Sequence, residues 1–482
     1  MIIIATILIY FSLLMGIAFI TSRNSKTNAA FFKGENKSPW YIVSFGMIGA
    51  SISGVTFVSV PGMVRSFDMT YMQTVCGFFF GYLIVAHLLL PLYYRLNLTS
   101  IYTYLGQRLG KRSYRTGSLF FLLSRLLGTS AKLYLVCLIL YTYIFQELQV
   151  PFWVIAVGTM VLVWVYTHQS GIKTIVWTDA LQTLCLLLAL IFILVFVIRY
   201  LNLDFVGVVD TIKNHEHGRI FVFDDWNSSQ NFFKQFLSGI FIVIVMTGLD
   251  QDMMQKNLSC RNLKEAQKNM YFYGFSFIPL NLLFLSLGIL LLVFAAKMQI
   301  ELPLQGDDIL PLFATQGYLG SSVEVFFALG VIAAAFSNSD SALTSMTTSF
   351  CIDILEVEKL SAEKAKKTRY GVHILFSALL ALFIILFKQI NNKSVIDVIY
   401  ILASYTYGPL LGMFGFGLFT KRVVTDRWVP YIAILSPVLC YVIEQVVETH
   451  SGYKFGYELL MLNGLLTFIG LLLFSSKRNA RV

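Results

Sequence analysis

The stretch AAAFSNSDSALTS at residues 333–345 places many oxygen atoms inside a long apolar run. It carries four serines, an asparagine, a threonine and an aspartate where a lipid-facing helix would carry leucines. Hydroxyl and carboxylate oxygens are hard ligands, which suit an alkali cation better than a transition metal. The alternative is that these small and polar residues only pack helices together. The number of oxygens favours a cation site, as does the aspartate, because a carboxylate at membrane depth is costly.

The stretch FGMIGASISGVTFVSVPG at residues 45–62 interrupts a second apolar run. Its glycines and serines permit a helix to unwind, and unwound backbone at membrane depth is tolerated where it is buried or lines a cavity. The freed carbonyls near Gly49 and Ile52 can then coordinate a cation. The hydroxyls of Ser53 and Thr56 lie three residues apart and share one helical face. A small-residue packing face of the GxxxG kind is the alternative.

Charged side chains also fall deep in other apolar runs. Arg125 and Lys132 are seven residues apart, so they face the same way on a helix. Lys132 lies near the midpoint of its run, where an ammonium needs a partner. A structural ion pair with a carboxylate and a contact with a substrate anion both stay open. Asp179 lies about two turns inside its run, at a depth where it can reach the oxygens of residues 333–345.

The segment VMTGLDQDMMQKN at residues 245–257 interrupts another apolar run, as the stretch at 45–62 does. Gly248 breaks the apolar run and is followed by Asp250, Asp252 and Lys256. A glycine and charges at this depth predict a second discontinuous helix.

Three further polar side chains are candidates for contact with a substrate or for gating. Gln73 lies near the outer end of its apolar run, where a packing or mouth position is the simpler interpretation and substrate contact is the alternative. Tyr405 and Tyr407 precede Pro409 in a glycine-rich run. A bend at the proline would let these two tyrosines act as a gate.

The composition indicates a polytopic membrane protein. The 482 residues are 57% hydrophobic and 13% charged, whereas soluble proteins carry about a quarter charged residues. The six cysteines show neither metal-ligand spacing nor a disulfide pattern. Apolar runs long enough to span a bilayer predict thirteen helices, at about residues 2–21, 40–65, 70–94, 116–146, 151–168, 173–199, 234–255, 270–296, 320–352, 370–388, 395–419, 428–446 and 457–475.

The loops between these runs alternate in charge. The outer set, including residues 204–231 and 299–308, is polar or acidic. The basic set lies at residues 22–37, 93–115, 259–269, 358–369, 420–422 and 475–482. Basic loops belong in the cytoplasm, which predicts an N-terminus outside and a C-terminus inside. The net charge of +10 then reflects these loops rather than nucleic-acid binding.

The two interrupted helices lie five spans apart and suggest an internal five-plus-five repeat. Because five is odd, the two halves insert with opposite orientation, which is the pattern of a secondary transporter with its site at the bilayer midplane. No GxxxxGK[ST] motif is present, which disfavours an ATP-driven motor. The absence of an arginine-rich voltage sensor and of a TVGYG-like filter disfavours a cation channel.

The chain resembles the sodium:solute symporter family, which includes sodium/glucose and sodium/sialic-acid transporters. The strongest marks are GIKTIVWTDALQ (171–182), AAAFSNSDSALTS (333–345) and YGPLLGMFGFGLFTKR (407–422), supported by residues 98–112 and 247–259. The resemblance implies a leucine-transporter-like, all-α fold within one transmembrane domain. Its parts would be an extra N-terminal helix (1–22), two inverted repeats (40–200 and 233–420) and two peripheral C-terminal helices (424–476).

The same resemblance implies a main sodium site between the first broken helix and the stretch at 333–345. Its ligands would be the carbonyls of Gly49, Ile52 and Ala334 together with the side chains of Ser337 and Asn338. The family usually carries Ser or Thr at position 338, so Asn338 is a departure, although an amide oxygen is also able to bind sodium.

Some family members carry a second sodium ion near the cytoplasmic side. Its ligands would be Asp179, Ser337, Asp340 and Ser341. Two nearby carboxylates otherwise repel one another or share a proton, which agrees with a second cation here. The expected cofactor is therefore Na+, as one or two ions.

The resemblance also bears on the substrate. In sialic-acid transporters the counterparts of Ser53 and Thr56 meet the substrate carboxylate, and Lys132 could supply the cationic side chain that those proteins bring from the third core helix. Sugar-transporting members carry a carboxylate at a position that falls near Val75, which disfavours a plain hexose.

The expected function is sodium-coupled import of a small organic solute by alternating access, with an anionic sugar acid such as sialic acid as substrate. The protein would lie in the plasma membrane, the inner membrane of a bacterium, with solute, sodium and lipid as partners and no obligate protein partner. A symporter of neutral sugars or other carboxylates, a proton-coupled symporter with Asp179 and Asp340 as relay acids, and a transporter-like sensor are alternatives. No soluble output domain follows residue 476, which disfavours the sensor, and no catalytic constellation indicates an enzyme.

Overall fold

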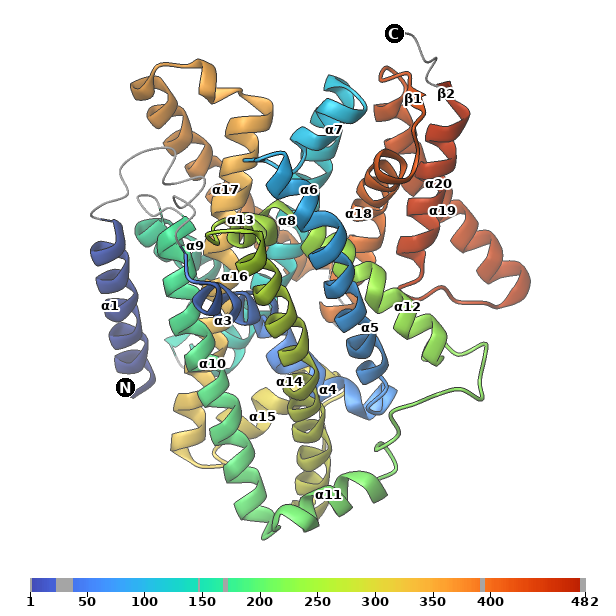
Figure 1. The fold of residues 1–482 in the computed structure, drawn as a ribbon. Helices are drawn as coiled ribbons and strands as arrows, with labels where there is room; N and C mark the ends of the chain where they lie inside the picture. The colour runs from blue at the N-terminus through green and yellow to red at the C-terminus, as the bar shows by residue number, and fades with distance from the viewer. Residues whose placement is uncertain (1, 23–37, 146–147, 168–171, 391–394, 477–482) are drawn as a thin grey trace.

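Helices make up nearly all of the structure, a computed structural model that describes every residue except 1, 23–37, 146–147, 168–171, 391–394 and 477–482. The prediction of an all-α protein is confirmed (Figure 1). Most of the predicted basic loop 22–37 and the end of the tail lie outside the described residues.

The first half of the chain contains α1 (Ile2–Ser22), α3 (Trp40–Ser51), α4 (Gly54–Phe67), α5 (Tyr71–Ile84), η2 (Val85–Leu89), α6 (Leu90–Arg95), α7 (Thr103–Arg108), α8 (Lys111–Ile139), η3 (Leu140–Ile144), α9 (Phe152–Thr167), α10 (Ile172–Leu201) and α11 (Phe205–Asn214). The second half contains α12 (Phe232–Val243), η5 (Ile244–Gly248), α13 (Gln251–Leu258), α14 (Leu263–Met298), η6 (Gly306–Asp308), α15 (Ile309–Thr315), α16 (Ser321–Ser349), η7 (Phe350–Ile354), η8 (Val357–Lys359), α17 (Ala362–Ile390), α18 (Val395–Phe419), α19 (Val429–Ser451) and α20 (Leu459–Leu473). Two short strands, β1 (Val423–Val424) and β2 (Ser475–Ser476), pair antiparallel.

Eight helical segments among the described residues are long and apolar enough to cross a membrane, and two bent helix pairs raise that number to ten. The helices α9 and α20 are shorter and also apolar. All thirteen predicted ranges coincide with helical segments, α1 included. The exact number of spans stays a prediction, because length and composition alone do not decide it for the shorter helices.

The two bent pairs lie where the sequence predicts discontinuous helices. The helices α3 and α4 meet at 56°, and the segment Phe232–Gly248 meets α13 at 65°. At the first break, the amide of Ser53 donates to Ser51 O, at 2.9 Å, rather than to Gly49 O. At the second break, Asp250 caps α13 by accepting from the backbone of the first turn. Both predicted interruptions are therefore confirmed.

The glycines of α3 explain why this helix can approach α10 closely. A Cβ on Gly49 would lie 1.9 Å from Thr183 Oγ1, and a Cβ on Gly46 would lie 3.0 Å from Asp179 Cβ. Thr183 Oγ1 in turn donates to Phe45 O, at 2.9 Å. The two glycines thus form a packing face, which the sequence left as the alternative, and the chain unwinds only after them, at Ile52 and Ser53. The packing places α3 directly beside Asp179, the acidic side chain of α10.

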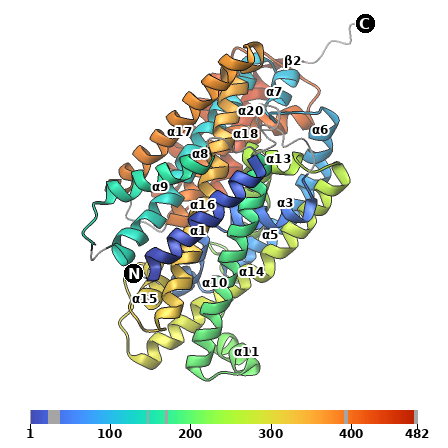
Figure 2. The same cartoon turned by 90° about the vertical axis from the view of Figure 1, so that its left-hand side faces the viewer.

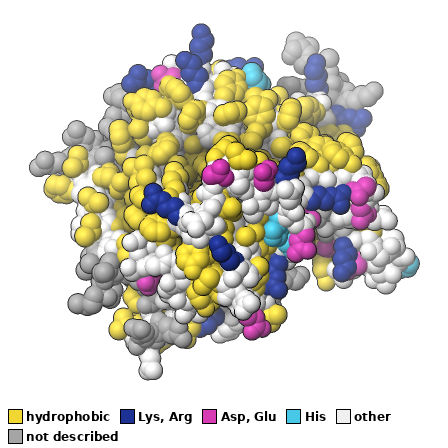
Figure 3. All heavy atoms as spheres, turned by 90° about the horizontal axis from the view of Figure 1, so that it is seen from below, with side chains coloured by type: hydrophobic (Ala, Val, Ile, Leu, Met, Phe, Trp, Pro, Cys, Tyr) yellow, Lys and Arg dark blue, Asp and Glu magenta, His cyan; other side chains and the backbone are white. Residues whose placement is uncertain are grey.

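The two ends of the molecule differ in the loops that they carry. The helix α7 and the β1–β2 pair lie at the end where the chain terminates, and α11 and α15 lie at the opposite end (Figure 1). Seen from that opposite end, acidic, basic and histidine side chains are interspersed (Figure 3). The predicted cytoplasmic loop at 93–115 belongs to the α7 end. There the Lys359 and Lys111 side chains donate to Glu356 and lower the pKa of its carboxyl to about 2.

The helix α1 is packed against the body of the protein rather than standing apart. It lies across α10 and α16 (Figure 2). At the other edge of the molecule, α19 and α20 pack against α18. The helices α10 and α16 therefore lie between α1 on one side and the two broken helices on the other.

Candidate functional site

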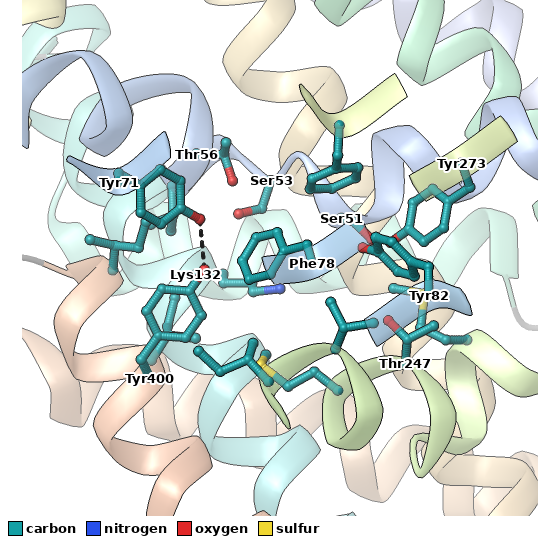
Figure 4. A pocket seen from close by; sticks show the side chains of 18 of the residues that line it. Ser51, Ser53, Thr56, Tyr71, Phe78, Tyr82, Lys132, Thr247, Tyr273 and Tyr400 are labelled. Atoms are coloured by element: carbon teal, nitrogen blue, oxygen red, sulfur yellow. Dashed lines mark hydrogen bonds between the residues drawn. The ribbon is translucent and has the colours of Figure 1, made fainter. Parts of the chain in front are cut away.

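A cavity opens between the two broken helices and the helices α5, α8, α14 and α18 (Figure 4). Its polar and aromatic lining residues are Ser51, Ser53, Thr56, Tyr71, Phe78, Tyr82, Arg125, Lys132, Thr247, Tyr273, Phe277 and Tyr400. A cavity that adjoins unwound backbone is the place where irregular structure at membrane depth is tolerated.

Three of the predicted substrate residues line this cavity. The hydroxyls of Ser53 and Thr56 and the ammonium of Lys132 point into it (Figure 4). Lys132 Nζ donates to Asn338 Oδ1, at 3.2 Å. In the part of the chain that the structure describes, no carboxylate lies within ion-pair distance of Lys132. The Lys132 ammonium therefore has an amide oxygen, and not a carboxylate, as its hydrogen-bond acceptor at the cavity.

Arg125 differs from Lys132 although both come from α8. Arg125 Nη1 lies 3.6 Å from Asp250 Oδ2, and Arg125 Nη2 forms a close ion pair with Asp252. The sequence left an ion pair and a substrate contact open for Lys132. The structure shows carboxylate partners at Arg125, whereas the hydrogen-bond acceptor of Lys132 is an amide oxygen.

Gln73 lies away from the cavity. Its Nε2 donates to Gln230 O, at 2.8 Å, and its Oε1 accepts from the amide of Val222, at 3.0 Å. Both ends of the side chain are thus used to hold the outer loop that follows α11. This is the packing position that the sequence analysis gave as the simpler interpretation, and the structure does not bring Gln73 to the other candidate substrate residues.

The two predicted gate tyrosines point away from each other. Tyr405 donates to Glu444 on α19, and Tyr407 donates to Asp250 at the second break. Residues two apart on a helix face nearly opposite directions, so one side chain reaches a peripheral helix and the other reaches the ion pairs around Arg125. Neither tyrosine is among the cavity-lining residues.

A wall of other tyrosines lines the cavity instead, and the sequence analysis missed it. The hydroxyls of Tyr71 and Tyr400 are hydrogen-bonded at 2.8 Å across the cavity (Figure 4). Tyr82 packs edge-on against Tyr273, with ring centroids 4.5 Å apart. Tyr71 and Tyr82 are eleven residues apart on one helical segment, which is close to three turns and places them on the same face. That spacing was a usable signal.

The predicted ligands of the main sodium site lie on α3, in the break that follows α3, and on α16. Gly49 O and Ile52 O accept no backbone hydrogen bond from any residue that the structure describes outside regular helix pairing. Asn338 Nδ2 donates to Ala334 O, at 3.2 Å, while Asn338 Oδ1 accepts from Lys132. The Asn338 amide therefore links Ala334 O, a predicted sodium ligand, to the Lys132 ammonium at the cavity.

The predicted residues of the second sodium site come together around one carboxylate. Ser337 Oγ donates to Asp179 Oδ1, at 2.7 Å, and Ser341 Oγ lies 3.3 Å from Asp179 Oδ2. Asp340 accepts from the hydroxyl of Tyr166, at 2.9 Å. Asp179, Ser337, Asp340 and Ser341 are buried, so the polar groups must satisfy one another or hold an ion.

The sequence analysis identified Lys256 but not its partner. Lys256 Nζ lies 2.7 Å from Asp179 Oδ2, and both side chains are buried. Asp252 lies one turn before Lys256 on α13 and pairs with Arg125. The short helix α13 is thereby attached to α8 through one ion pair and to α10 through another. Helix periodicity alone does not predict a pairing between separate helices.

These side chains form one buried charged cluster, which consists of Arg125, Lys132, Asp179, Asp250, Asp252, Lys256 and Asp340. Its four carboxylates exceed its three cationic groups by one negative charge if every member is ionised. Burying an uncompensated charge is unfavourable. One monovalent cation would balance the cluster.

Sequence comparisons find relatives along most of the chain. A family model described as the sodium:solute symporter family matches residues 31–426. A sodium/sialic acid symporter of Aliivibrio fischeri is 26% identical over 426 residues, which cover 86% of this chain and 82% of that protein. A sodium/sialic acid symporter of Proteus mirabilis is 26% identical over 446 residues, which cover 88% of this chain and 86% of that protein.

The fold is similar to that of a solved transporter. The substrate-bound, outward-open structure of a Na+-coupled sialic acid symporter matches with a TM-score of 0.82 and 21% identity, over 98% of this chain and 97% of that chain. At this identity the likeness concerns the fold. It confirms the predicted polytopic architecture with its broken helices.

Proposed function

Because this chain belongs to the sodium:solute symporter family, we propose that it uses the entry of sodium to import a small organic anion by alternating access. A sugar acid such as sialic acid is the first candidate substrate. Two of its relatives are sodium/sialic acid symporters, and this is the reason for testing that compound before other carboxylates. The protein would be an integral membrane protein, with its C-terminus in the cytoplasm and its N-terminus outside.

The observation that carries the proposal is the position of Lys132. Its ammonium faces the cavity beside the hydroxyls of Ser53 and Thr56, and an amide rather than a carboxylate is its hydrogen-bond acceptor. A substrate carboxylate between these three groups would receive one charge-assisted hydrogen bond and up to two from hydroxyls. The tyrosines that line the cavity supply apolar area, and Tyr71 and Tyr400 also supply phenol hydroxyls.

For the main sodium site we propose the carbonyls of Gly49, Ile52 and Ala334 with the side chains of Ser337 and Asn338. The two carbonyls at the break have no other described backbone donor, which supports them as ligands. Asn338 would turn its amide oxygen from Lys132 toward the ion, and this would free Lys132 for the substrate. Sodium and substrate would then favour each other's binding through one side chain.

For the second sodium site we propose Asp179 and Asp340 with the hydroxyls of Ser337 and Ser341. The excess negative charge of the charged cluster supports this assignment. Coupling between sodium and substrate is reciprocal, so each raises the affinity for the other by the same factor. A membrane potential of about 100 mV adds about 2.3 kcal/mol of driving force for each sodium ion that enters.

The deciding experiment is uptake into proteoliposomes under a sodium gradient without a pH gradient. Labelled sialic acid, a neutral hexose and a simple monocarboxylate would be supplied in parallel. Accumulation of the sugar acid that requires sodium is the expected result. Uptake driven only by a pH gradient would support the proton-coupled alternative, and no uptake with sodium would contradict the proposal.

Replacing Lys132 with alanine is expected to weaken binding of the anionic substrate about tenfold or more, because a charge-assisted hydrogen bond contributes about 1.5–3 kcal/mol. The measurement is the half-saturating substrate concentration at saturating sodium. The methyl ester of the same sugar acid should lose much less affinity, since it carries no carboxylate. The variant Lys132→Arg keeps the cation and serves as the control. Equal losses for acid and ester would remove the proposed contact.

Replacing Ser337 with alanine is expected to raise the half-saturating sodium concentration about tenfold, because the variant loses an oxygen ligand and a hydrogen bond to Asp179. Sodium titration of uptake at fixed substrate measures the effect. Ser339→Ala is the matched control, since Ser339 is also buried on α16 but donates to Ala335 O of its own helix. Equal sodium requirements in the two variants would exclude Ser337 from the sites.

A further inference from the structure

A row of aromatic rings follows the loop that joins α11 to α12 and continues onto α12 and α5. In Figure 1 this loop runs along the edge of the molecule, from α11 at the lower end to the start of α12. Neighbouring rings of the row have their centroids between 4.7 and 6.0 Å apart. The members of this aromatic ridge are Phe80, Phe221, Phe223, Trp226, Phe232, Phe233 and Phe236.

The backbone of the loop holds the first two of these rings toward the outside. Phe221 and Phe223 are 47% and 57% exposed, whereas Val222 between them is buried, which is the alternation of an extended chain. The amide of Val222 donates to Gln73 Oε1, at 3.0 Å, and its carbonyl accepts from the amide of Phe232, at 2.8 Å. The loop is thereby attached to α5 and α12, and the two rings point away from that attachment.

The turn that carries Trp226 is ordered as well. Asp225 Oδ1 accepts from the amides of Asn227 and Ser228, at 2.9 and 3.0 Å. Asn231 Nδ2 donates to Asp225 O, at 3.1 Å. Trp226 nevertheless remains 64% exposed. A backbone that is fixed by hydrogen bonds and still exposes several large rings indicates an interaction surface.

The ridge continues an apolar strip on a helix that is long enough to cross the membrane. Phe80, Ile84 and Leu88 follow one another at intervals of four residues along α5 and η2 and are 48%, 37% and 38% exposed. Leu237, one turn after Phe233 on α12, is also exposed. Exposed apolar side chains on a membrane-spanning helix face lipid. Because the ridge joins this strip through Phe80, lipid is the partner that fits it.

Charged side chains beside the rings indicate the depth of the ridge in the membrane. Arg219 and Asp224 form an ion pair in the same loop, and their side chains are 47% and 70% exposed. Exposed charges and irregular backbone are not tolerated in the hydrocarbon region. Tryptophan and phenylalanine rings beside charged groups are typical of segments that lie at the boundary between headgroups and acyl chains.

We propose that the aromatic ridge is a lipid-binding surface, whose rings insert among the headgroups at the end of the molecule that carries α11. By the proposed topology these are the headgroups of the outer leaflet. The inference goes beyond the proposed transport function, because its ligand is the membrane surface and not the solute or sodium. It also does not depend on that function.

The test measures the fluorescence of Trp226 in the full-length protein, reconstituted in phosphatidylcholine nanodiscs. The difference between the spectra of the wild type and of Trp226→Phe isolates this side chain from the other tryptophans. Lipids that are brominated near the headgroup end of their acyl chains are expected to quench the difference signal about threefold more strongly than lipids brominated near the methyl end. Iodide in the buffer is expected to quench it weakly.

A tryptophan in water on the same loop provides the reference. The Glu216 side chain is charged and 83% exposed, so Glu216→Trp in the Trp226→Phe background should be quenched by iodide and not by brominated lipid. Iodide should quench this reference about threefold more strongly than it quenches Trp226.

A second variant tests whether the neighbouring rings hold the loop in the membrane. Phe223→Ser removes one exposed ring of the ridge and is expected to raise iodide quenching of Trp226 about twofold, because the loop then inserts less deeply. Phe419→Ser is the matched control. Phe419 is 73% exposed at the end of α18 and lies outside the ridge, so its replacement should leave the quenching of Trp226 unchanged.

Three outcomes would overturn the inference. Iodide quenching of Trp226 as strong as in the reference, without quenching by brominated lipid, would place the loop in water. Protection from both quenchers would show that protein, such as a second copy of this chain, covers the ridge. An effect of Phe223→Ser no larger than that of Phe419→Ser would remove the role of the ridge in insertion. Transport is measured in none of these experiments, so their failure is distinct from a failure of sodium-driven uptake.

Discussion

Replacing Asp179 with asparagine is expected to abolish sodium-driven accumulation of substrate. The substitution keeps the shape of the side chain but removes the charge to which Ser337, Ser341 and Lys256 are directed. Loss of one partner from a buried pair costs about 3 kcal/mol or more, which corresponds to about a hundredfold in a binding constant. The measurement is uptake into proteoliposomes as a function of the sodium gradient.

Asp353→Asn is the matched control for this variant. Asp353 is an equally buried carboxylate, and it accepts hydrogen bonds from four hydroxyls, those of Ser100, Tyr114, Ser118 and Ser349. It lies in η7, which follows α16, and takes no part in the proposed sodium sites. Its loss should lower stability and leave the sodium dependence in place. An Asp179→Asn variant with normal sodium dependence would exclude Asp179 from coupling.

The sequence predicts the two broken helices well because their signals are local. Glycine, serine and charge within an apolar run mark a place where regular helix is weak, and both breaks lie within the predicted stretches. The exact residue of unwinding is less predictable. The sequence predicts unwinding near Gly49. In the structure a glycine is required there because a side chain would collide with Thr183, and the chain unwinds at Ile52 instead.

Contacts between distant segments are what sequence reasoning missed. The partner of Arg125 lies 127 residues away, and the partner of Tyr71 lies 329 residues away. A single sequence gives no spacing rule for such pairs, because the rules concern neighbours on one helix or one strand. Gln73 illustrates the same limit, since its orientation depends on an outer loop whose own path is not periodic.

The tyrosine predictions show where a simple rule was available. Tyr405 and Tyr407 are two residues apart, and helix geometry already excludes that both face one pathway. Tyr71 and Tyr82, at a spacing close to three turns, satisfy the same rule and line the cavity. Glycine and proline near a tyrosine indicate a bend but not the direction of the side chain.

The attachment of α13 bears on how the transporter would open. Asp252 and Lys256 hold this short helix to α8 and α10. Any movement of α13 toward an open state must loosen one of these pairs or carry its partner helix along. If sodium binds at the proposed second site, Lys256 would compete with it for Asp179, because an ammonium and a metal ion cannot use the same oxygen atoms fully at one time. Sodium binding is therefore expected to weaken the ion pair between Lys256 and Asp179, which attaches α13 to α10.

Replacing Lys256 with methionine is expected to make the stability of the protein depend strongly on sodium. The variant leaves Asp179 and Asp340 close together without a cation from the protein, which costs about 3 kcal/mol or more in a buried site. The melting temperature in choline chloride should therefore fall well below that of the wild type, and sodium chloride at the same ionic strength should restore part of the loss. The half-saturating sodium concentration should also decrease, because the competing ammonium is gone.

The double variant Asp179→Asn with Lys256→Met separates charge balance from shape. Removing both members of a buried pair costs much less than removing one, so this protein should regain stability in choline chloride. It should show a smaller response to sodium than Lys256→Met, since it retains one carboxylate fewer. If Lys256→Met melts at the same temperature in sodium and in choline, then Lys256 only attaches α13 to α10, and the competition with sodium does not exist.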